Sequence, residues 1–261
     1  MDNHTLIRIE SVSKHYGPPR DGVLALRDVS LDVRAGEFLS IIGPSGCGKS
    51  TLLRLVGDLL APNEGRILID GRTPAQARRA RETAIVFQSP TLMEWRSIAS
   101  NIQLPLEILK LAHAERERRA AELLDLIRLR DFGARYPHEL SSGMQQQVAI
   151  ARALAYRPAI LLMDEPFGAL DEMTRERLGR ELLDIWDRTR VTILFVTHSV
   201  GEAVMLSDRV AVLTPRPGQI ERVIEVDLPR PRTVDLREAP RYAELVRAVR
   251  AALRLNGNGR K

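Results

Sequence analysis

Nine consecutive residues have the composition of a loop that binds phosphate. They fit the pattern G-x-x-x-x-G-K-[ST], the Walker A motif, and read Gly43-Pro44-Ser45-Gly46-Cys47-Gly48-Lys49-Ser50-Thr51. Glycines let the backbone turn its N–H groups toward the phosphates of a nucleotide, and Lys49 adds a positive charge beside the β- and γ-phosphates. Ser50 offers a hydroxyl to Mg²⁺. The pattern therefore predicts a nucleoside triphosphate site with Mg²⁺, to which all nine residues contribute.

A strand and a helix should flank such a loop. Residues 37–42 form a short apolar run that is typical of a buried strand, and residues 51–56 have apolar positions at helical spacing. A helix that starts here directs the positive end of its dipole at the same anion. This context favours a phosphate site over a glycine-rich turn with an incidental lysine.

Two adjacent carboxylates, Asp164 and Glu165, follow a second apolar run at residues 160–163. A strand of this kind, the Walker B motif, carries the first carboxylate to the phosphate site, where it helps to hold Mg²⁺. The second can orient or deprotonate the water that attacks the γ-phosphate. An Asp-Glu-Pro sequence also occurs in ordinary turns at strand ends, but the Walker A motif upstream favours the catalytic interpretation.

Length and composition suit one large domain, or a core with an inserted subdomain. The chain has 261 residues, of which 44% are hydrophobic and 28% charged. Its 39 lysines and arginines are interspersed with 34 acidic residues, so we interpret the net charge of +5 as a solvated surface. A single cysteine, Cys47, allows no disulfide within the chain. We expect a soluble, cytoplasmic protein without a secretory signal, because no apolar run approaches the ~18–20 residues that cross a bilayer.

Strands and helices alternate in the sequence pattern. Strands are expected at 6–12, 66–71, 83–87, 160–163, 191–197 and 208–213, and a strand pair is expected at 23–33. The strand at 208–213 is expected to be the last one. Helices are expected at 112–130, 145–154, 172–189, 200–206 and 239–253. Residues 89–106 contain two prolines and are predicted to be irregular. The glycine-rich end at 256–259 is predicted to fray.

This alternation predicts an α/β fold of the P-loop NTPase class. We expect a core with a mostly parallel sheet, an N-terminal antiparallel β-subdomain and a helical subdomain inserted at about 89–157. The core with its insertion is placed at 1–225, and a C-terminal tail with one helix at 226–261.

Seven motifs together resemble those of the ATP-binding subunits of ABC transporters, in the order typical of that family, from about Leu6 to Arg222. They are Tyr16 in the adenine-stacking loop, Walker A, Gln88 in the Q-loop, the signature Leu140-Ser141-Ser142-Gly143-Met144, Walker B, the D-loop Gly168-Ala169-Leu170-Asp171, and the switch histidine His198. An aromatic ring such as Tyr16 can stack on a base, although packing is the commoner role of an aromatic residue beside a loop.

The resemblance implies an ABC-type fold that binds ATP and Mg²⁺ and hydrolyses ATP. Glu165, His198 and Gln88 would take part in hydrolysis, and Gln88 would join Ser50 and Asp164 near the metal. These roles come from the family and are expectations for this chain.

The resemblance also implies a dimer of two such subunits that encloses two ATP molecules head to tail. Ser141, Ser142 and Gly143 of one subunit would then meet the nucleotide bound by the partner, and Asp171 would lie near the same site. The family signature usually reads Leu-Ser-Gly-Gly-Gln. Ser142 places a side chain where bare backbone normally approaches phosphate, so we expect it to slow ATP turnover mildly.

Several tracts resemble more narrowly the nitrate, sulfonate and taurine import group, namely 165–171, 195–203, 206–210 and 215–218. These are bacterial importers with separate permease subunits and an external solute-binding protein. The resemblance therefore implies both as partners, a peripheral position on the cytoplasmic face of the inner membrane, and no nucleic acid.

The segment 89–107 is predicted to dock the permease. It follows Gln88 and carries Leu92, Met93 and Trp95, and aromatic and methionine side chains often anchor interfaces. Core packing of Trp95 is the alternative. Cys47 is expected to lie where a bulky label on its thiol would obstruct ATP binding.

Other P-loop proteins share part of this motif set. A P-loop kinase or small GTPase has no signature, D-loop or switch histidine. A structural-maintenance or DNA-repair ATPase inserts a long coiled coil before the signature, where this chain has no extended heptad run. A translation-associated ATPase normally carries two cassettes in one chain, whereas this chain has a single cassette. A non-transport ABC ATPase that acts on nucleic acid or the ribosome is therefore the alternative to a transporter subunit.

Overall fold

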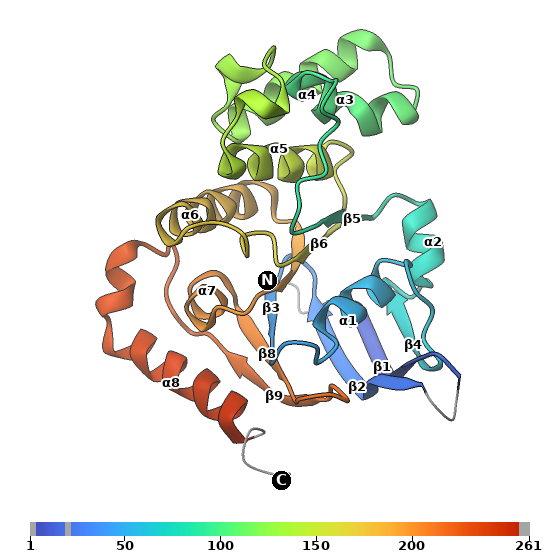
Figure 1. The fold of residues 1–261 in the computed structure, drawn as a ribbon, viewed down its shortest axis with the longest axis vertical. Coiled ribbons are helices and arrows are strands. Elements are labelled where there is room, and N and C mark those ends of the chain that lie inside the picture. The colour runs from blue at the N-terminus through green and yellow to red at the C-terminus, as the bar shows by residue number, and fades with distance from the viewer. Residues whose placement is uncertain (1–3, 19–21, 256–261) are drawn as a thin grey trace.

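Two β-sheets form the frame of the molecule (Figure 1), in a computed structural model that describes residues 4–18 and 22–255. A three-stranded antiparallel sheet has the order β2-β1-β4, and a six-stranded sheet has the order β5-β6-β7-β3-β8-β9. In the larger sheet only β9 runs antiparallel to its neighbour. The strands are β1 Thr5–Tyr16, β2 Val23–Arg34, β3 Phe38–Ile42, β4 Glu64–Ile69, β5 Thr83–Val86, β6 Ile160–Asp164, β7 Thr192–Val196, β8 Arg209–Leu213 and β9 Ile220–Glu225.

Both faces of the five parallel strands of the larger sheet are buried, which explains why these strands are mostly apolar, whereas the edge strand β9 carries exposed charged residues. In β6, Leu161 and Met163 pack with α5 and α6, while Ile160 and Leu162 pack with α1 and the smaller sheet. Strands that are covered on both faces need apolar side chains at every position. The continuous apolar runs of the sequence therefore mark the centre of the fold.

Helices cover both faces of the larger sheet and extend beyond one edge. Figure 1 shows α3, α4 and α5 gathered beyond the end of the sheet that carries β5 and β6, and α8 beside β8 and β9. No helix among the described residues is long and apolar enough to cross a membrane. The α-helices are α1 Lys49–Val56, α2 Pro74–Arg79, α3 Ile98–Ile108, α4 His113–Leu126, α5 Ser142–Leu154, α6 Glu172–Thr189, α7 Val200–Leu206 and α8 Pro240–Leu255.

The prediction of an irregular segment at 89–106 is wrong for its second part, where α3 forms. Ser97 caps the first turn of this helix with its hydroxyl, and Ile102 and Leu106 are buried in the core. Pro105 lies inside the helix and removes one backbone hydrogen bond. Burial of the apolar face of α3 outweighs that loss.

Other boundaries differ from the prediction for local reasons. The expected strand pair at 23–33 is the single strand β2. Helix α4 ends at Leu126 rather than at 130, because the chain turns at Arg128 with a φ of 59°. Helix α5 begins at Ser142 rather than at 145. Helix α2 and strand β9 were not predicted, and β9 rather than β8 is the last strand. The predicted frayed end at 256–259 lies outside the described residues.

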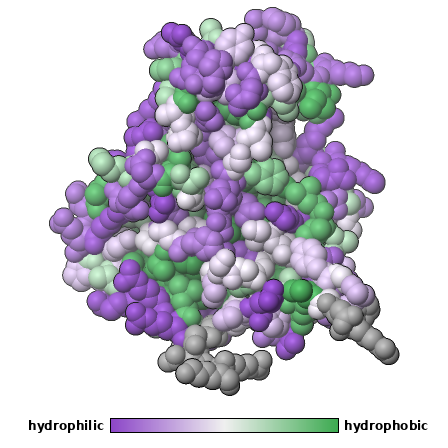
Figure 2. Space-filling view, in the orientation of Figure 1, coloured by the Kyte–Doolittle hydropathy of each residue, from purple (hydrophilic) through white to green (hydrophobic). Residues whose placement is uncertain are grey.

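Charged and polar side chains cover most of the face drawn in Figure 2, and the apolar ones form separate patches. Many arginines pair with a nearby carboxylate, as Arg118 does with Glu122 at 2.8 Å and Arg241 with Asp227 at 2.9 Å. Exposed pairs of this kind contribute little to stability. They agree with the interpretation of a solvated surface of mixed charge.

Candidate functional site

Three neighbouring parallel strands bring the predicted site residues to one edge of the larger sheet. Asp164 at the end of β6 pairs with Val196 at the end of β7, and Val196 pairs with Ile41 of β3. The loops that follow these strands start with Glu165 after β6, with Thr197 and His198 after β7, and with the phosphate-binding loop after β3. Parallel pairing therefore places the three motifs side by side.

The phosphate-binding loop is closed around its lysine. The Lys49 Nζ donates hydrogen bonds to the carbonyl oxygens of Gly43 at 2.9 Å and Pro44 at 3.0 Å, and Lys49 is 4% exposed. Gly48 has a φ of +103°, and a Cβ there would lie 2.9 Å from the carbonyl oxygen of Ala25. Only glycine fits this position, where the chain turns into α1.

A hollow of about 380 Å³ opens beside this loop. It brings seven of the predicted binding residues together with the predicted catalytic residues Glu165 and His198. The lining residues are Tyr16, Val23, Ala25, Ser45, Gly46, Gly48, Lys49, Ser50, Thr51, Glu165, His198 and Arg216.

Ser50 and Asp164 form the part of the site that suits a metal ion. The Ser50 hydroxyl donates to Asp164 Oδ1 at 2.6 Å, and Asp164 is 8% exposed. Mg²⁺ prefers hard oxygen ligands and usually takes several of them from substrate phosphates and water. Within residues 4–18 and 22–255, no group of three or more His, Cys, Asp or Glu side chains could hold a metal ion. These two oxygens therefore fit a metal held mainly by a nucleotide.

Glu165 and His198 form a close pair at the mouth of the hollow. His198 Nε2 lies 2.6 Å from Glu165 Oε1. Glu165 has a φ of 50°, a backbone conformation that non-glycine residues rarely adopt and that clusters at functional sites. The Glu165 N–H donates to the carbonyl oxygen of Val196 at 3.0 Å, which ties this turn to β7. The carboxylate is thus fixed by both its backbone and its histidine partner.

A chain of polar contacts joins the D-loop to the residue before His198. Arg175 donates to the carbonyl oxygen of Leu170 at 2.9 Å, and its Nε lies 3.5 Å from Glu202 Oε1. The other Glu202 oxygen accepts a hydrogen bond from the hydroxyl of Thr197. Burial raises the pKa of Glu202. Side chains of α6 and α7 therefore connect the D-loop to Thr197, the residue before His198.

The signature residues lie outside the hollow of their own chain. Ser141 is the N-cap of α5, where its Oγ accepts from the N–H of Met144 at 3.3 Å, and Ser141 and Ser142 are exposed. A Cβ at Gly143 would lie 2.8 Å from Thr174 Cγ2, so glycine is required here by the packing of α5 against α6.

Gln88 and Asp171 also lie outside the hollow. Gln88 is exposed, and its Nε2 would be 3.2 Å from a Cβ placed on Gly168. Asp171 caps α6 by accepting from the N–H of Thr174 at 3.0 Å, and this hydrogen bond lowers the pKa of Asp171. Each of these two residues can therefore contact nucleotide or metal only if another molecule completes the site or the conformation changes.

Comparison with known proteins identifies the family. The profile described as "ABC transporter" matches residues 26–168, more than half of the chain. The chain belongs to the ABC transporter family. This ABC ATPase hydrolyses ATP, as the predicted resemblance implied.

Named relatives and a solved structure match most of this ABC ATPase. It is 42% identical to the nitrate import ATP-binding protein NrtD of Synechococcus elongatus over 247 residues, which cover 93% of this chain and 89% of the relative. It is 44% identical to the taurine import ATP-binding protein TauB of Rhizobium johnstonii over 236 residues, 88% and 89% of the two chains. The cassette MJ0796, solved as a dimer in a post-hydrolysis state with ADP and Pi, superposes with a TM-score of 0.74 at 35% identity, over 85% of this chain and 99% of that one. The predicted ABC-type fold is confirmed.

Tyr16 lies at one side of the nucleotide hollow of the ABC ATPase. It is 38% exposed, and its hydroxyl lies 3.2 Å from Thr51 Oγ1. An exposed ring beside the phosphate-binding loop is able to stack on a base. Its role as the adenine platform stays a prediction.

The side chain of Cys47 lies on the inner side of the loop, where its Sγ accepts a hydrogen bond from Lys49 Nζ at 4.0 Å. This side chain is fully buried, in the core cluster between α1 and the two sheets. A Cβ on Gly43 would lie 2.7 Å from Cys47 Sγ, so the thiol also packs against the start of the loop. Cys47 does not line the hollow, and the effect of a label at its thiol on ATP binding stays a prediction.

Arg216 is a lining residue that sequence reasoning missed. It lies between β8 and β9, in a loop that returns to β2, where the Gly218 N–H donates to the Ala25 carbonyl oxygen at 2.9 Å. The Arg216 side chain is exposed and has no partner among the described residues. In the sequence, the pattern at 215–218 indicates only a resemblance to the import group. A free guanidinium beside a phosphate-binding loop suits contact with an anion.

We expect the thiol of Cys47 in the folded protein to react with a maleimide on the order of a hundredfold more slowly than in the urea-unfolded chain. Burial excludes the reagent, and it also raises the pKa of the thiol, which lowers the thiolate fraction at neutral pH. Mass spectrometry of timed samples measures both rates. Labelling of the native protein at the unfolded rate would contradict the buried position.

We expect Arg216→Ala to raise the Kd for MgATP about three- to tenfold, because a partly solvated charge contact with phosphate is worth about 1 kcal/mol. Isothermal calorimetry measures this. Arg222→Ala is the matched control, since Arg222 is an exposed arginine on β9 that does not line the hollow. Equal affinities for the two variants would remove Arg216 from the site.

Proposed function

We propose that this ABC ATPase is the energy-supplying subunit of a bacterial importer for a small solute of the nitrate, sulfonate or taurine kind. The observation that carries the catalytic part is the 2.6 Å contact between Glu165 and His198, at the same sheet edge as Lys49. The relatives named for nitrate and taurine import support the importer role.

In the proposed reaction Lys49 and the loop N–H groups hold the ground-state phosphates. Lys49 donates to two carbonyl oxygens of its own loop, which keep the ammonium in place. Phosphate oxygens replace these acceptors when ATP binds. Tyr16 lies at the side of the hollow where the base would rest. Lys49 therefore contributes mainly to the binding of ATP.

Glu165 acts on the attacking water. Its carboxylate orients the water and accepts its proton as the water oxygen bonds to the γ-phosphorus and the bond to the ADP oxygen breaks. His198 holds that carboxylate, and it lines the same hollow as the phosphate-binding loop. Ser50 and Asp164 would hold Mg²⁺, which neutralises charge on the phosphates when bound.

The active unit is a head-to-tail dimer. Ser141 and the start of α5 are exposed and lie outside the hollow of their own chain, so a second copy has to supply them to each nucleotide. The dimeric state of the MJ0796 cassette supports this arrangement. The N-terminus of α5 would add its dipole to the stabilisation of the γ-phosphate.

The permease docks on the segment that follows Gln88. Trp95 is 76% exposed, which excludes the core position considered as its alternative, whereas Leu92 and Met93 are partly buried. Ile108 at the end of α3 is 71% exposed. Bound there, the ATPase lies peripherally on the cytoplasmic face of the membrane and reaches the external solute-binding protein only through the permease.

We expect Lys49→Ala and Glu165→Gln to separate binding from hydrolysis. Loss of a charged contact with phosphate should weaken ATP binding on the order of 10–100-fold in Lys49→Ala. Glu165→Gln should bind ATP normally, stop hydrolysis and accumulate an ATP-bound dimer. Calorimetry, phosphate release and size exclusion measure the three quantities. Hydrolysis by Glu165→Gln at the parent rate would mean that another group is the base.

We expect Trp95→Ala to lower the amount of ATPase that copurifies with coexpressed permease subunits at least several-fold, because exposed tryptophans often anchor interfaces. ATP affinity and the melting temperature should stay unchanged. Leu59→Ala, which removes a half-exposed apolar side chain after α1, is the control. Normal copurification of Trp95→Ala would place the docking surface elsewhere.

A further inference from the structure

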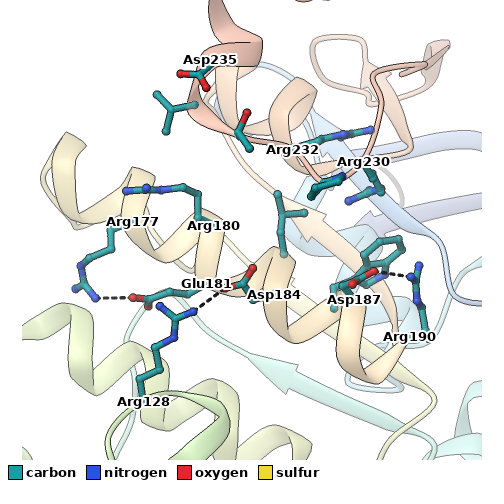
Figure 3. A pocket seen from close by; sticks show the side chains of 15 residues that line it. Arg128, Arg177, Arg180, Glu181, Asp184, Asp187, Arg190, Arg230, Arg232 and Asp235 are labelled. Atoms are coloured by element: carbon teal, nitrogen blue, oxygen red, sulfur yellow. Dashed lines mark hydrogen bonds and ion pairs between the residues drawn. The ribbon is translucent and has the colours of Figure 1, made fainter.

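A second hollow, of about 1000 Å³, lies along α6 and shares no lining residue with the nucleotide hollow. Its walls come from α6, from residues 230–235 of the C-terminal tail, and from Arg128 after α4. Figure 3 shows Arg230 and Arg232 on one side, with Arg177 and Arg180 on the other. The nucleotide chemistry described above makes no use of this hollow.

The hollow carries an excess of positive charge. Its lining includes six arginines and four carboxylates, and Asp208 outside the lining pairs with Arg230 at 2.7 Å, which leaves an excess of one positive charge. Three of the carboxylates are already paired with lining arginines, among them Asp184 with Arg128 at 3.0 Å and Glu181 with Arg177 at 2.9 Å. Arg180 has no side-chain partner within the described ranges 4–18 and 22–255. The charge of Arg180 is therefore available to a ligand.

Arg232 is a buried cation without a carboxylate. It is 6% exposed, and its terminal nitrogens donate to backbone carbonyl oxygens, such as that of Ser207 at 2.6 Å. Its Nε has no hydrogen-bond partner among the described residues. Burial lowers the pKa of Arg232 to about 10. The nearby charges of Asp208 and Arg230 act on Arg232 in opposite directions, so an anion in the hollow would add counter-charge at this position.

Trp186 supplies a second buried N–H group without an acceptor. It is 2% exposed, and no described residue accepts from its Nε1. The guanidinium of Arg230 lies 4.0 Å from the centre of a Trp186 ring, and that of Arg190 lies 4.8 Å away. Buried N–H groups are almost always paired in folded proteins. Both unpaired donors belong to residues that line the positively charged hollow, and both nitrogen atoms are themselves buried, so an acceptor in the hollow reaches them when neighbouring side chains move.

We infer that this hollow binds an oxyanion, a phosphate, sulfate, sulfonate or carboxylate group. Such a group offers several oxygen acceptors and negative charge, which match guanidinium donors and the indole N–H. Leu183 and Pro231 add apolar surface to the lining. The volume exceeds that of one inorganic ion, and it suits an organic anion whose apolar part packs against these residues.

Trp186 can report binding directly, because the chain has two tryptophans and Trp95→Phe leaves Trp186 as the only one. Lys49→Ala in the same chain weakens anion binding at the phosphate-binding loop. We expect sodium sulfate and sodium 1-butanesulfonate to change the Trp186 emission saturably, and sodium chloride of equal ionic strength to leave it unchanged. Tighter binding of butanesulfonate identifies an organic anion as the ligand, and equal binding identifies a free inorganic one.

Arg180→Ala in this background should weaken the anion affinity at least tenfold. Arg79→Ala is the matched control, since Arg79 is an exposed arginine on α2 with no side-chain partner among the described residues. Calorimetry extends the test to Trp186→Phe, which keeps the ring shape and removes the N–H, and it should also lose affinity. No saturable signal, or equal affinity in Arg180→Ala and Arg79→Ala, overturns the inference. Neither result bears on ATP hydrolysis, which is measured separately.

Discussion

The parallel pairing of β6, β7 and β3 is the constraint on which the site depends. Because the three strands run in the same direction, their carboxyl ends open at one edge, and the row Asp164–Val196–Ile41 fixes how far each strand reaches. A slip of one residue would exchange the two faces of a strand. It would also separate the Asp164 carboxylate from the Ser50 hydroxyl, which now lie 2.6 Å apart. Packing on both faces of the sheet thus sets the register that the chemistry needs.

Backbone contacts hold the loops at that edge in conformations that would otherwise be unfavourable. Glu165 has a φ of 50°, which is unfavourable for a non-glycine residue, and its N–H donates to Val196 of β7, whereas the φ of +103° at Gly48 is one that glycine adopts readily. The chain that runs from Leu170 through Arg175 and Glu202 to Thr197 connects this edge to the D-loop.

Motif spacing predicted most of the site because loops after parallel strands have to meet. Lys49, Ser50, Asp164, Glu165 and His198 each lie within two residues of a strand or at the start of a helix that the sequence pattern indicates. The same reasoning predicted the two sheets and the helical insertion. It needed no knowledge of side-chain packing.

The predictions that failed concern features that are determined by contacts between residues far apart in the sequence. Arg216 reaches the hollow because its loop hydrogen-bonds to β2, a pairing far apart in sequence. Helix α3 forms despite Pro105 because its apolar face is buried. In each case tertiary packing overrides the local pattern.

The central claim is that each ATP site is built from two chains, since Lys49 lines the hollow and Ser141 does not. The most direct test mixes two variants within one assembled transporter, Lys49→Ala, which lacks the phosphate contact, and Ser141→Arg, which blocks the signature. Each variant alone should be inactive. A mixed dimer joins the intact phosphate-binding loop of one chain to the intact signature of the other, so mixing should restore ATP hydrolysis to a substantial fraction of the parent rate. A mixture as inactive as the separate variants would contradict the two-chain site.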